Sequence, residues 1–172
     1  MKTSLGDIFR ILKLELGLAK GFRMSSVIVF FRIASYAING QSPMRHFFRP
    51  IAVLYKIYTE FLLGIELPAG TEIGQGLRVY HGVGLVIHKG VRIGTGCVLR
   101  QAVTIGNKGE GEHADLLPVI GDNVEFGAGA TVIGNLKIGD NVIIGAGTVV
   151  TKDVPSNSVV VGPPARILAK KS

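Results

Sequence analysis

The sequence predicts an all-β main domain, a parallel β-helix built from hexapeptide repeats, that follows an α-helical cap. Three observations predict it. Apolar anchor residues recur six positions apart, and a Gly directly follows several of them. Ten of the twelve Phe and Tyr residues lie in 1–61, whereas 20 of the 24 Gly residues lie in 64–162. The cleanest run of anchors is Ile120, Phe126, Val132, Ile138, Ile144 and Val150.

A six-residue period fits neither an amphipathic helix nor an alternating strand, but it fits a coil of short stacked strands. An earlier run reads Ile73, Val79, Leu85 and, after a two-residue slip, Ile93, Leu99, Ile105. Small or aliphatic residues four places after each anchor, such as Val83 and Cys97, are expected to face inward. Cys97 is the single Cys, and we interpret it as a core filler. The pattern gives about four coils of three strands each.

The first 64 residues form the predicted helical segment. Apolar spacing predicts a helix over 4–20 and a second over 25–38, with Ser25 or Ser26 as its N-cap. A turn over 39–43 precedes a third helix over 50–63, which Gly64 ends.

Two interpretations of this segment stay open. Its helices cover the open end of the β-helix at an oligomer contact, or residues 22–63 also rest on an anionic membrane surface. The first 65 residues carry a net charge of +6 out of +7 for the whole chain. No signal peptide is visible, and the apolar stretch 27–38 is too short to span a bilayer. We therefore expect a cytoplasmic protein, either free or at the inner face of the membrane. Basic residues fringe the helices at Arg23, Arg32, Arg45, Arg49 and Lys56.

The predicted β-helix domain covers 65–154, and a C-terminal tail covers 155–172. Pro155, Pro163 and Pro164 are expected to stop further strand pairing in the tail. Between Ile105 and Ile120 the spacing is fifteen rather than twelve, so residues 107–117 must leave the coil as a loop. Loops on a rigid scaffold often carry function.

The chain resembles the hexapeptide-repeat acyltransferases, in particular the serine acetyltransferase branch and its short relatives that O-acetylate exopolysaccharide sugars, such as the colanic acid acetyltransferases. The resemblance covers residues 47–170. It implies a left-handed coil, a homotrimer with active sites between subunits, and acetyl-CoA as co-substrate. It rests on the segments 64–66 (GIE), 80–82 (YHG), 100–107 (RQAVTIGN) and 161–166 (VGPPAR).

Two residues match the catalytic machinery of that family. An acetyl thioester is already activated, so the protein needs chiefly a base for the acceptor hydroxyl, and the pKa of His suits this task. His81 lies two places after the anchor Val79, faces away from the interior and matches the family's catalytic His. Glu66 stands where the serine enzymes carry an Asp that orients this His, and its alternative role is a contact between cap and coil.

The resemblance also suggests where acetyl-CoA binds. Gly106, Asn107, Ala128 and Ala146 match positions along which the family lays pantetheine. Positive charge for the phosphates is expected from Lys152, Arg166, Lys170 and Lys171, which are alternatively plain surface charge. The sequence holds no P-loop or Rossmann Gly-rich motif.

The acceptor is less well defined. Tyr80 and His113 are expected to contact it, although a solvated loop His is an alternative for His113. The serine enzymes carry a second His just before a Pro, where this chain has Leu117 before Pro118. This departure disfavours serine. We interpret His88 as a structural or subunit-contact residue.

The leading interpretation is an acetyl-CoA-dependent O-acetyltransferase that acts on a sugar hydroxyl in capsule or exopolysaccharide synthesis, with a lipid-linked saccharide as acceptor. The main alternative is serine O-acetyltransferase. A zinc hydratase using His81, His88 and His113 and a non-enzymatic scaffold are further alternatives, but the histidine spacing does not match the hydratase family. We expect no metal cofactor and no nucleic-acid partner.

Overall fold

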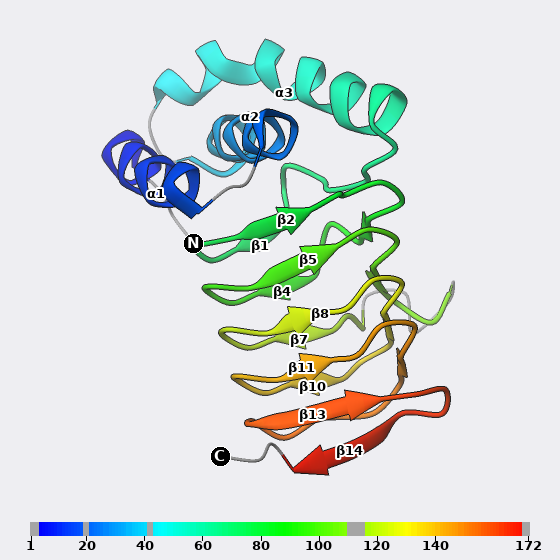
Figure 1. The fold of residues 1–172 in the computed structure, drawn as a ribbon. Coiled ribbons are helices and arrows are strands. Elements are labelled where there is room, and N and C mark those ends of the chain that lie inside the picture. The colour runs from blue at the N-terminus through cyan, green and yellow to red at the C-terminus, as the bar shows by residue number, and fades with distance from the viewer. Residues whose placement is uncertain (1–3, 19–20, 41–42, 110–115, 170–172) are drawn as a thin grey trace.

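The computed structural model describes residues 4–18, 21–40, 43–109 and 116–169, and it shows a stack of short strands beneath a helical cap (Figure 1). The helices are α1 (Leu5–Leu18), α2 (Phe22–Asn39), the 3-10 helix η1 (Pro43–Phe48), α3 (Arg49–Lys56) and the π-helix η2 (Ile57–Leu62).

The strands form three faces of a prism, each a sheet that collects strands from successive coils. The first face holds β1 (Glu72–Ile73), β4 (Arg92–Ile93), β7 (Val119–Ile120) and β10 (Lys137–Ile138). The second holds β2 (Arg78–Tyr80), β5 (Val98–Arg100), β8 (Glu125–Phe126), β11 (Ile143–Ile144), β13 (Ser158–Val161) and β14 (Arg166–Ala169). The third holds β3 (Val86–Ile87), β6 (Thr104–Gly106), β9 (Thr131–Ile133) and β12 (Val149–Val150).

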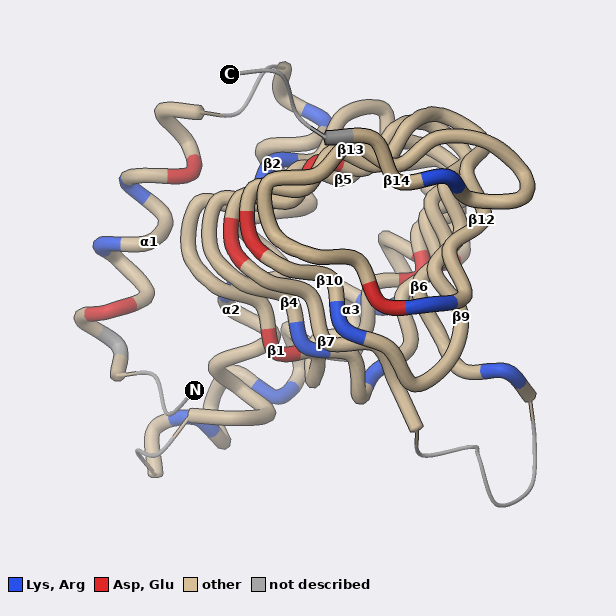
Figure 2. The backbone as a smooth tube through the Cα atoms, turned by 90° about the horizontal axis from the view of Figure 1, so that it is seen from below, with Lys and Arg blue, Asp and Glu red and all other residues tan. Residues whose placement is uncertain are grey.

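The coil is left-handed. Figure 2 looks along the axis from the C-terminal end, so the chain advances towards the viewer. As it advances, it turns clockwise from the face of β10, through the face of β13, to the face of β12. The predicted fold class, a left-handed parallel β-helix with an N-terminal helical cap, is confirmed.

The repeat anchors form the core, because those from Ile120 to Val150 are each at most 3% exposed. Cys97 is also buried, and desolvation raises the pKa of its thiol to about 11, so the thiol stays protonated at neutral pH. The predicted role as a core filler is confirmed. Close stacking of coils requires Gly127, since a Cβ atom there would lie 2.4 Å from the backbone nitrogen of Ala146.

The predicted position of the two-residue slip is wrong. β2 pairs with β5 so that Val79 faces Leu99, and β3 pairs with β6 so that Ile87 faces Ile105. The anchor of the third face is therefore Ile87 rather than Leu85, and the extra residues precede Leu85. Leu85 is fully buried and fills the inner corner that was assigned to Val83, which is 51% exposed.

The spacing argument for the loop also needs correction. Strand β7 follows β6 directly along the chain, so the fifteen residues from Ile105 to Ile120 replace an ordinary spacing of six, not twelve. Residues 116 and 117 lead back into β7, and residues 110–115 lie outside the described part of the chain.

The helical cap differs from its prediction at the helix boundaries. α2 begins at Phe22 behind Gly21 (φ 91°), ahead of the predicted caps Ser25 and Ser26. The Ser25 hydroxyl instead donates a hydrogen bond to the Gly21 carbonyl. The third predicted helix is divided among α3 and η2, with η1 before them.

Arg32 is not a fringe residue as predicted but lies buried between cap and coil. Its guanidinium pairs with Glu15 on α1, which is fully buried, and donates to the carbonyls of Ile73 and Gly74. The Glu15 carboxylate also accepts a hydrogen bond of 2.9 Å from the Leu77 amide. A buried charge needs such partners, so this pair fixes α1 and α2 onto the first coil.

The far end of the stack closes differently. Strand β13 pairs in parallel with β11 and buries Val160, so the predicted tail 155–172 contributes a strand to the β-helix. The chain then turns through Pro163 and Pro164, and β14 pairs antiparallel with β13. The prediction that the tail prolines stop further strand pairing is therefore wrong.

Candidate functional site

His81 lies on an outward bulge between the second and third faces. Tyr80 faces Arg100 in the next coil, and the Ala102 amide donates to the Val83 carbonyl. His81 and Gly82 are therefore the two residues with no counterpart in that coil. We call this corner the His81 edge; it comprises residues 81–85, 101–103, 127–130 and 145–148.

The backbone of the bulge is tightly folded. Amides of Gly82 and Val83 donate to the carbonyls of Tyr80 and His81, two residues back in each case, at 2.9 and 2.6 Å. His81 has a φ of 65°, which is uncommon for a residue with a Cβ atom. The extra residues lift the chain off the prism, and the His81 side chain is exposed, as the sequence predicts.

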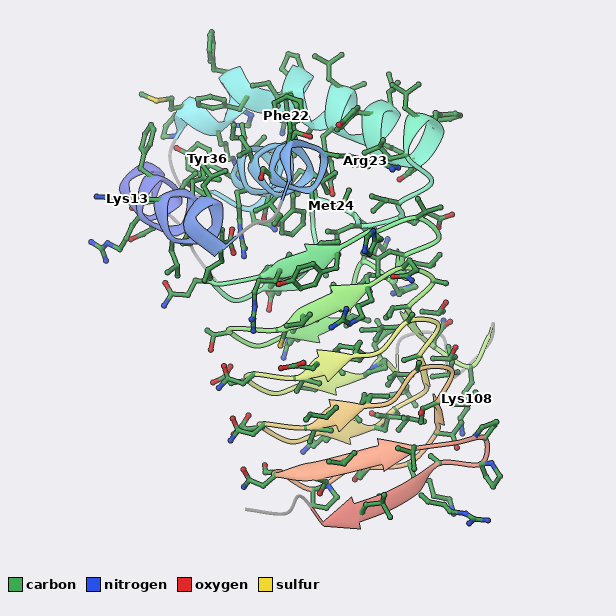
Figure 3. The ribbon with its side chains drawn as sticks, in the orientation of Figure 1. Lys13, Phe22, Arg23, Met24, Tyr36 and Lys108 are labelled. Atoms are coloured by element: carbon green, nitrogen blue, oxygen red, sulfur yellow. The ribbon has the colours of Figure 1, made fainter. Side chains whose placement is uncertain are left out.

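Gly82 is required in the bulge for two reasons. Its φ is 51°, and a Cβ atom there would lie 2.7 Å from Cδ1 of Ile65 and 3.2 Å from the sulfur of Met24. Figure 3 shows Met24 between α2 and β2. The start of α2 and the bulge together line a hollow that includes Phe22, Arg23, Tyr80 and His81. The cap therefore backs the bulge and forms one wall beside it.

Tyr80 is half-buried directly before His81. The guanidinium carbon of Arg100, one coil further along, lies 5.3 Å from the centre of the Tyr80 ring. This distance is typical of a cation–π contact. It holds a positive charge and an aromatic ring together next to His81.

Glu66 is exposed and pairs with Val86, the first residue of β3 and five positions after His81. Its side chain lines a second hollow, on the third face, together with His88 and Asn107. Within the described residues, no hydrogen bond or ion pair joins Glu66 to His81. The orienting role of Glu66 stays a prediction.

Sequence reasoning did not assign His88 and Lys89 to a site, yet both line this second hollow with Glu66. His88 is half-buried, and its Nδ1 accepts a hydrogen bond of 3.3 Å from the Gly90 amide. The only feature of the sequence that could have indicated a site role for His88 is its position directly after the buried anchor Ile87. That anchor could be recognised only from the register of β3 on β6.

The predicted cofactor residues fall into two groups. Gln101, Ala128 and Ala146 occupy equivalent positions in successive coils at the His81 edge. Two hydrogen bonds show this: the Gly129 amide donates to the Gln101 carbonyl, and the Gly147 amide donates to the Ala128 carbonyl. Gly106 and Asn107 lie across the third face, where the Gly134 amide bonds the Gly106 carbonyl. We call this second corner the loop edge (residues 107–109, 116–118, 134–136 and 151–153). A six-residue side separates the two edges by roughly 20 Å.

The remaining predicted positions are dispersed. Lys152 lines a hollow at the C-terminal end of the stack, and Arg166 is exposed at the start of β14. Lys108, labelled in Figure 3, lines a hollow at the loop edge with Leu116, Gly134 and Asn135. Three predicted residues lie outside the described part of the chain: His113, Lys170 and Lys171.

No cluster of three His, Cys, Asp or Glu side chains suited to a metal ion comes together among the described residues. The zinc alternative included His113, so the structure does not test it. The described helices also include none that is long and apolar enough to cross a bilayer.

Residues 118–152 match the family described as "Bacterial transferase hexapeptide (six repeats)". The chain is 43% identical over 118 residues to the putative colanic acid biosynthesis acetyltransferase WcaB of Escherichia coli K12, covering 69% of this chain and 72% of that protein. The chain belongs to the hexapeptide-repeat transferase family. The predicted resemblance is confirmed, and so is the class of enzyme, an acyltransferase.

Serine acetyltransferases also resemble this hexapeptide-repeat transferase. That of Staphylococcus xylosus is 46% identical over 118 residues, which cover 69% of this chain and 54% of that protein. The solved soybean apoenzyme has a TM-score of 0.72 at 31% identity, covering 86% of this chain and 58% of that one. The Neisseria gonorrhoeae enzyme has a TM-score of 0.75 at 28% identity, covering 94% and 66%. The chain thus spans between about half and two thirds of the length of these three serine acetyltransferases.

Proposed function

We propose that this chain transfers an acetyl group from acetyl-CoA to a hydroxyl of a sugar, carried on a lipid-linked saccharide at the inner face of the cell membrane. The observation that supports it best is the two-residue bulge, which holds an exposed imidazole at an edge of a rigid prism. The similarity to colanic acid and serine acetyltransferases supports acetyl as the transferred group.

His81 acts as the general base in this proposal. Its imidazole takes the proton of the acceptor hydroxyl while that oxygen attacks the thioester carbonyl carbon. The tetrahedral intermediate collapses by breaking the C–S bond, and the imidazolium returns its proton to the leaving thiolate. The products are an O-acetyl ester and free CoA. Glu66 is proposed to orient the imidazole, and Tyr80 and His113 to contact the acceptor.

The His81 edge suits the pantetheine arm. Ala128 is half-buried and Ala146 exposed, and neither has a side chain beyond Cβ to obstruct a chain laid along the coils. Lys152 and Arg166, at the C-terminal end, are proposed to meet the phosphates. In this proposal the two cations take the place of a Gly-rich phosphate loop.

Two separate edges carry the proposed groups, and one chain does not bring them together. We therefore propose a homotrimer in which the His81 edge of one subunit faces the loop edge of the next, with Gly106 and Asn107 on the second side of the cleft. A closed cyclic assembly makes every such contact equivalent.

The proposal is tested by following CoA thiol release with acetyl-CoA and a panel of free sugars, lipid-linked saccharides and serine. His81→Ala should lower turnover by about 10²–10⁴-fold, because it removes the base. His46→Ala, which removes an exposed imidazole on η1, is the matched control and should leave turnover on free sugars unchanged. A loss smaller than about tenfold for His81→Ala would contradict the assignment.

The same panel decides the acceptor. If serine is the preferred acceptor, the proposed sugar O-acetylation is wrong and the alternative function, serine O-acetylation, takes its place. The similarity to serine acetyltransferases favours that alternative, whereas Leu117 before Pro118 in place of the expected His disfavours it.

A further inference from the structure

One surface of the cap leaves large apolar side chains in water. We call it the outer face: the exposed side of η1, α3 and η2. Figure 3 shows the side chains of these elements projecting away from the β-helix. Contiguous apolar surface of this kind marks an interaction site more often than scattered single residues do. The exposed fractions are 80% for Phe47, 61% for Val53, 59% for Leu54, 47% for Ile57, 79% for Phe61 and 72% for Leu62.

The outer face is amphipathic in its own right. Val53, Ile57 and Phe61 are spaced four residues apart and form one stripe along the helix. Arg49 and Lys56, seven residues apart and both exposed, share a helix face beside that stripe. The acidic partner on this surface is Glu60, whose carboxylate lies 3.8 Å from the Lys56 ammonium. An apolar stripe beside cations is typical of helices that lie in a membrane interface.

The position of the outer face separates it from the proposed catalytic edges. It lies at the end of the prism axis, opposite β14, whereas the three sheets run along the sides (Figure 1). Subunits that pack side by side through those sides would all present their outer faces in the same direction. Three such faces would form a platform perpendicular to the axis.

We propose that the outer face docks peripherally on an anionic lipid bilayer, with Phe61 and Leu62 entering the interface and Arg49 and Lys56 meeting the headgroups. Charge complementarity favours a bilayer over a second copy of the chain, because two outer faces would bring like charges together. The inference extends the proposed function by naming the surface that would bring the enzyme to a lipid-linked acceptor.

Vesicle flotation of the full chain tests it, with phosphatidylcholine vesicles that contain either no anionic lipid or about one third phosphatidylglycerol. The wild type should float with anionic vesicles and lose binding as salt rises, since screening weakens the headgroup contacts. Phe61→Glu should reduce the bound fraction by about tenfold or more, because a Phe side chain that the bilayer would bury is replaced by a charge. Phe9→Glu is the matched control: Phe9 is 67% exposed but lies on α1, away from the outer face, and this variant should float like the wild type.

Charge reversal provides a second readout. Arg49→Glu with Lys56→Glu should abolish binding to anionic vesicles, whereas Arg10→Glu with Lys13→Glu, two exposed cations on α1, should leave most of it. Thiol release with a free sugar acceptor should be unchanged in all four variants. Loss of vesicle binding and loss of catalysis are thus separate outcomes.

Three results would overturn the proposal. One is absence of wild-type binding to anionic vesicles, and another is equal binding by the wild type and Phe61→Glu. The third is light scattering in which the wild type is twice the mass of Phe61→Glu, because a second copy would then cover the face.

Discussion

The β-helix and the helical cap bury their surfaces by different means. Each coil covers the one before it, so anchors such as Phe126 and Ile144 are fully buried within a single chain. Polar turn residues also serve the stack: Asn123 donates to Asn141, and Asn141 to Asn157, along one corner. The cap has no such repeat, and its outer face stays exposed while its inner side is buried.

Specific contacts hold the cap in place where repetition cannot. The Arg32–Glu15 pair joins two helices to the first coil, and the Tyr55 hydroxyl donates a buried hydrogen bond of 2.6 Å to the Leu67 carbonyl. The coil therefore spreads its stability over many equivalent positions, whereas the cap depends on a few contacts. Its remaining apolar surface is then available for a partner.

The largest stability effect should come from breaking the buried pair. Arg32→Ala leaves the Glu15 carboxylate buried without its guanidinium, at a cost of about 3–5 kcal/mol in the free energy of unfolding. Urea denaturation measures this loss. The double variant Arg32→Met with Glu15→Leu removes both charges and should lose less than Arg32→Ala. A single variant within about 1 kcal/mol of the wild type would show that the pair does not hold the cap.

One substitution type should give opposite signs in the two regions. Gly127→Ala places a Cβ atom against the backbone of the next coil and should cost about 1–3 kcal/mol. Gly17→Ala, near the end of α1, meets nothing within 4 Å and should stabilise the chain by up to about 1 kcal/mol through helix propensity. Thermal unfolding of both variants measures the contrast. Equal shifts of the same sign would contradict this account of coil stacking.

The repeat made most of the coil predictable, because one buried anchor every six residues is visible in the sequence alone. The slip was misplaced because Leu85 lies six residues after Val79, which is the spacing expected of the next anchor, and Leu85 is itself apolar. The pairing of Tyr80 with Arg100 and the bond from the Ala102 amide to the Val83 carbonyl show that the chain bulges at His81 and Gly82 instead. The sequence therefore indicated the catalytic candidate but not the backbone feature that exposes it.

The cap was less predictable because its contacts join residues with no common period. Arg32 appears in the sequence as a cation in an apolar stretch, and nothing local marks Glu15, seventeen residues earlier, as its buried partner. The division of the cofactor residues between two edges was equally hidden. Gly106 and Ala128 both occupy regular positions of the hexapeptide repeat. Gly106 comes at the end of a third-face strand and Ala128 comes just before one, so the two residues lie near different corners of the prism.

Mixing two inactive variants tests most directly the claim that one site uses the His81 edge of one subunit and the loop edge of the next. His81→Ala removes the base. Gly106→Val places bulk on β6 directly beside the loop edge, where a Cβ atom has room but a larger side chain would enter the hollow that Asn107 also lines. Refolded together in equal amounts, they should regain about a quarter of wild-type thiol release, because random assembly leaves both edges intact at that fraction of interfaces. No recovery from verified mixed trimers would contradict a site shared between subunits.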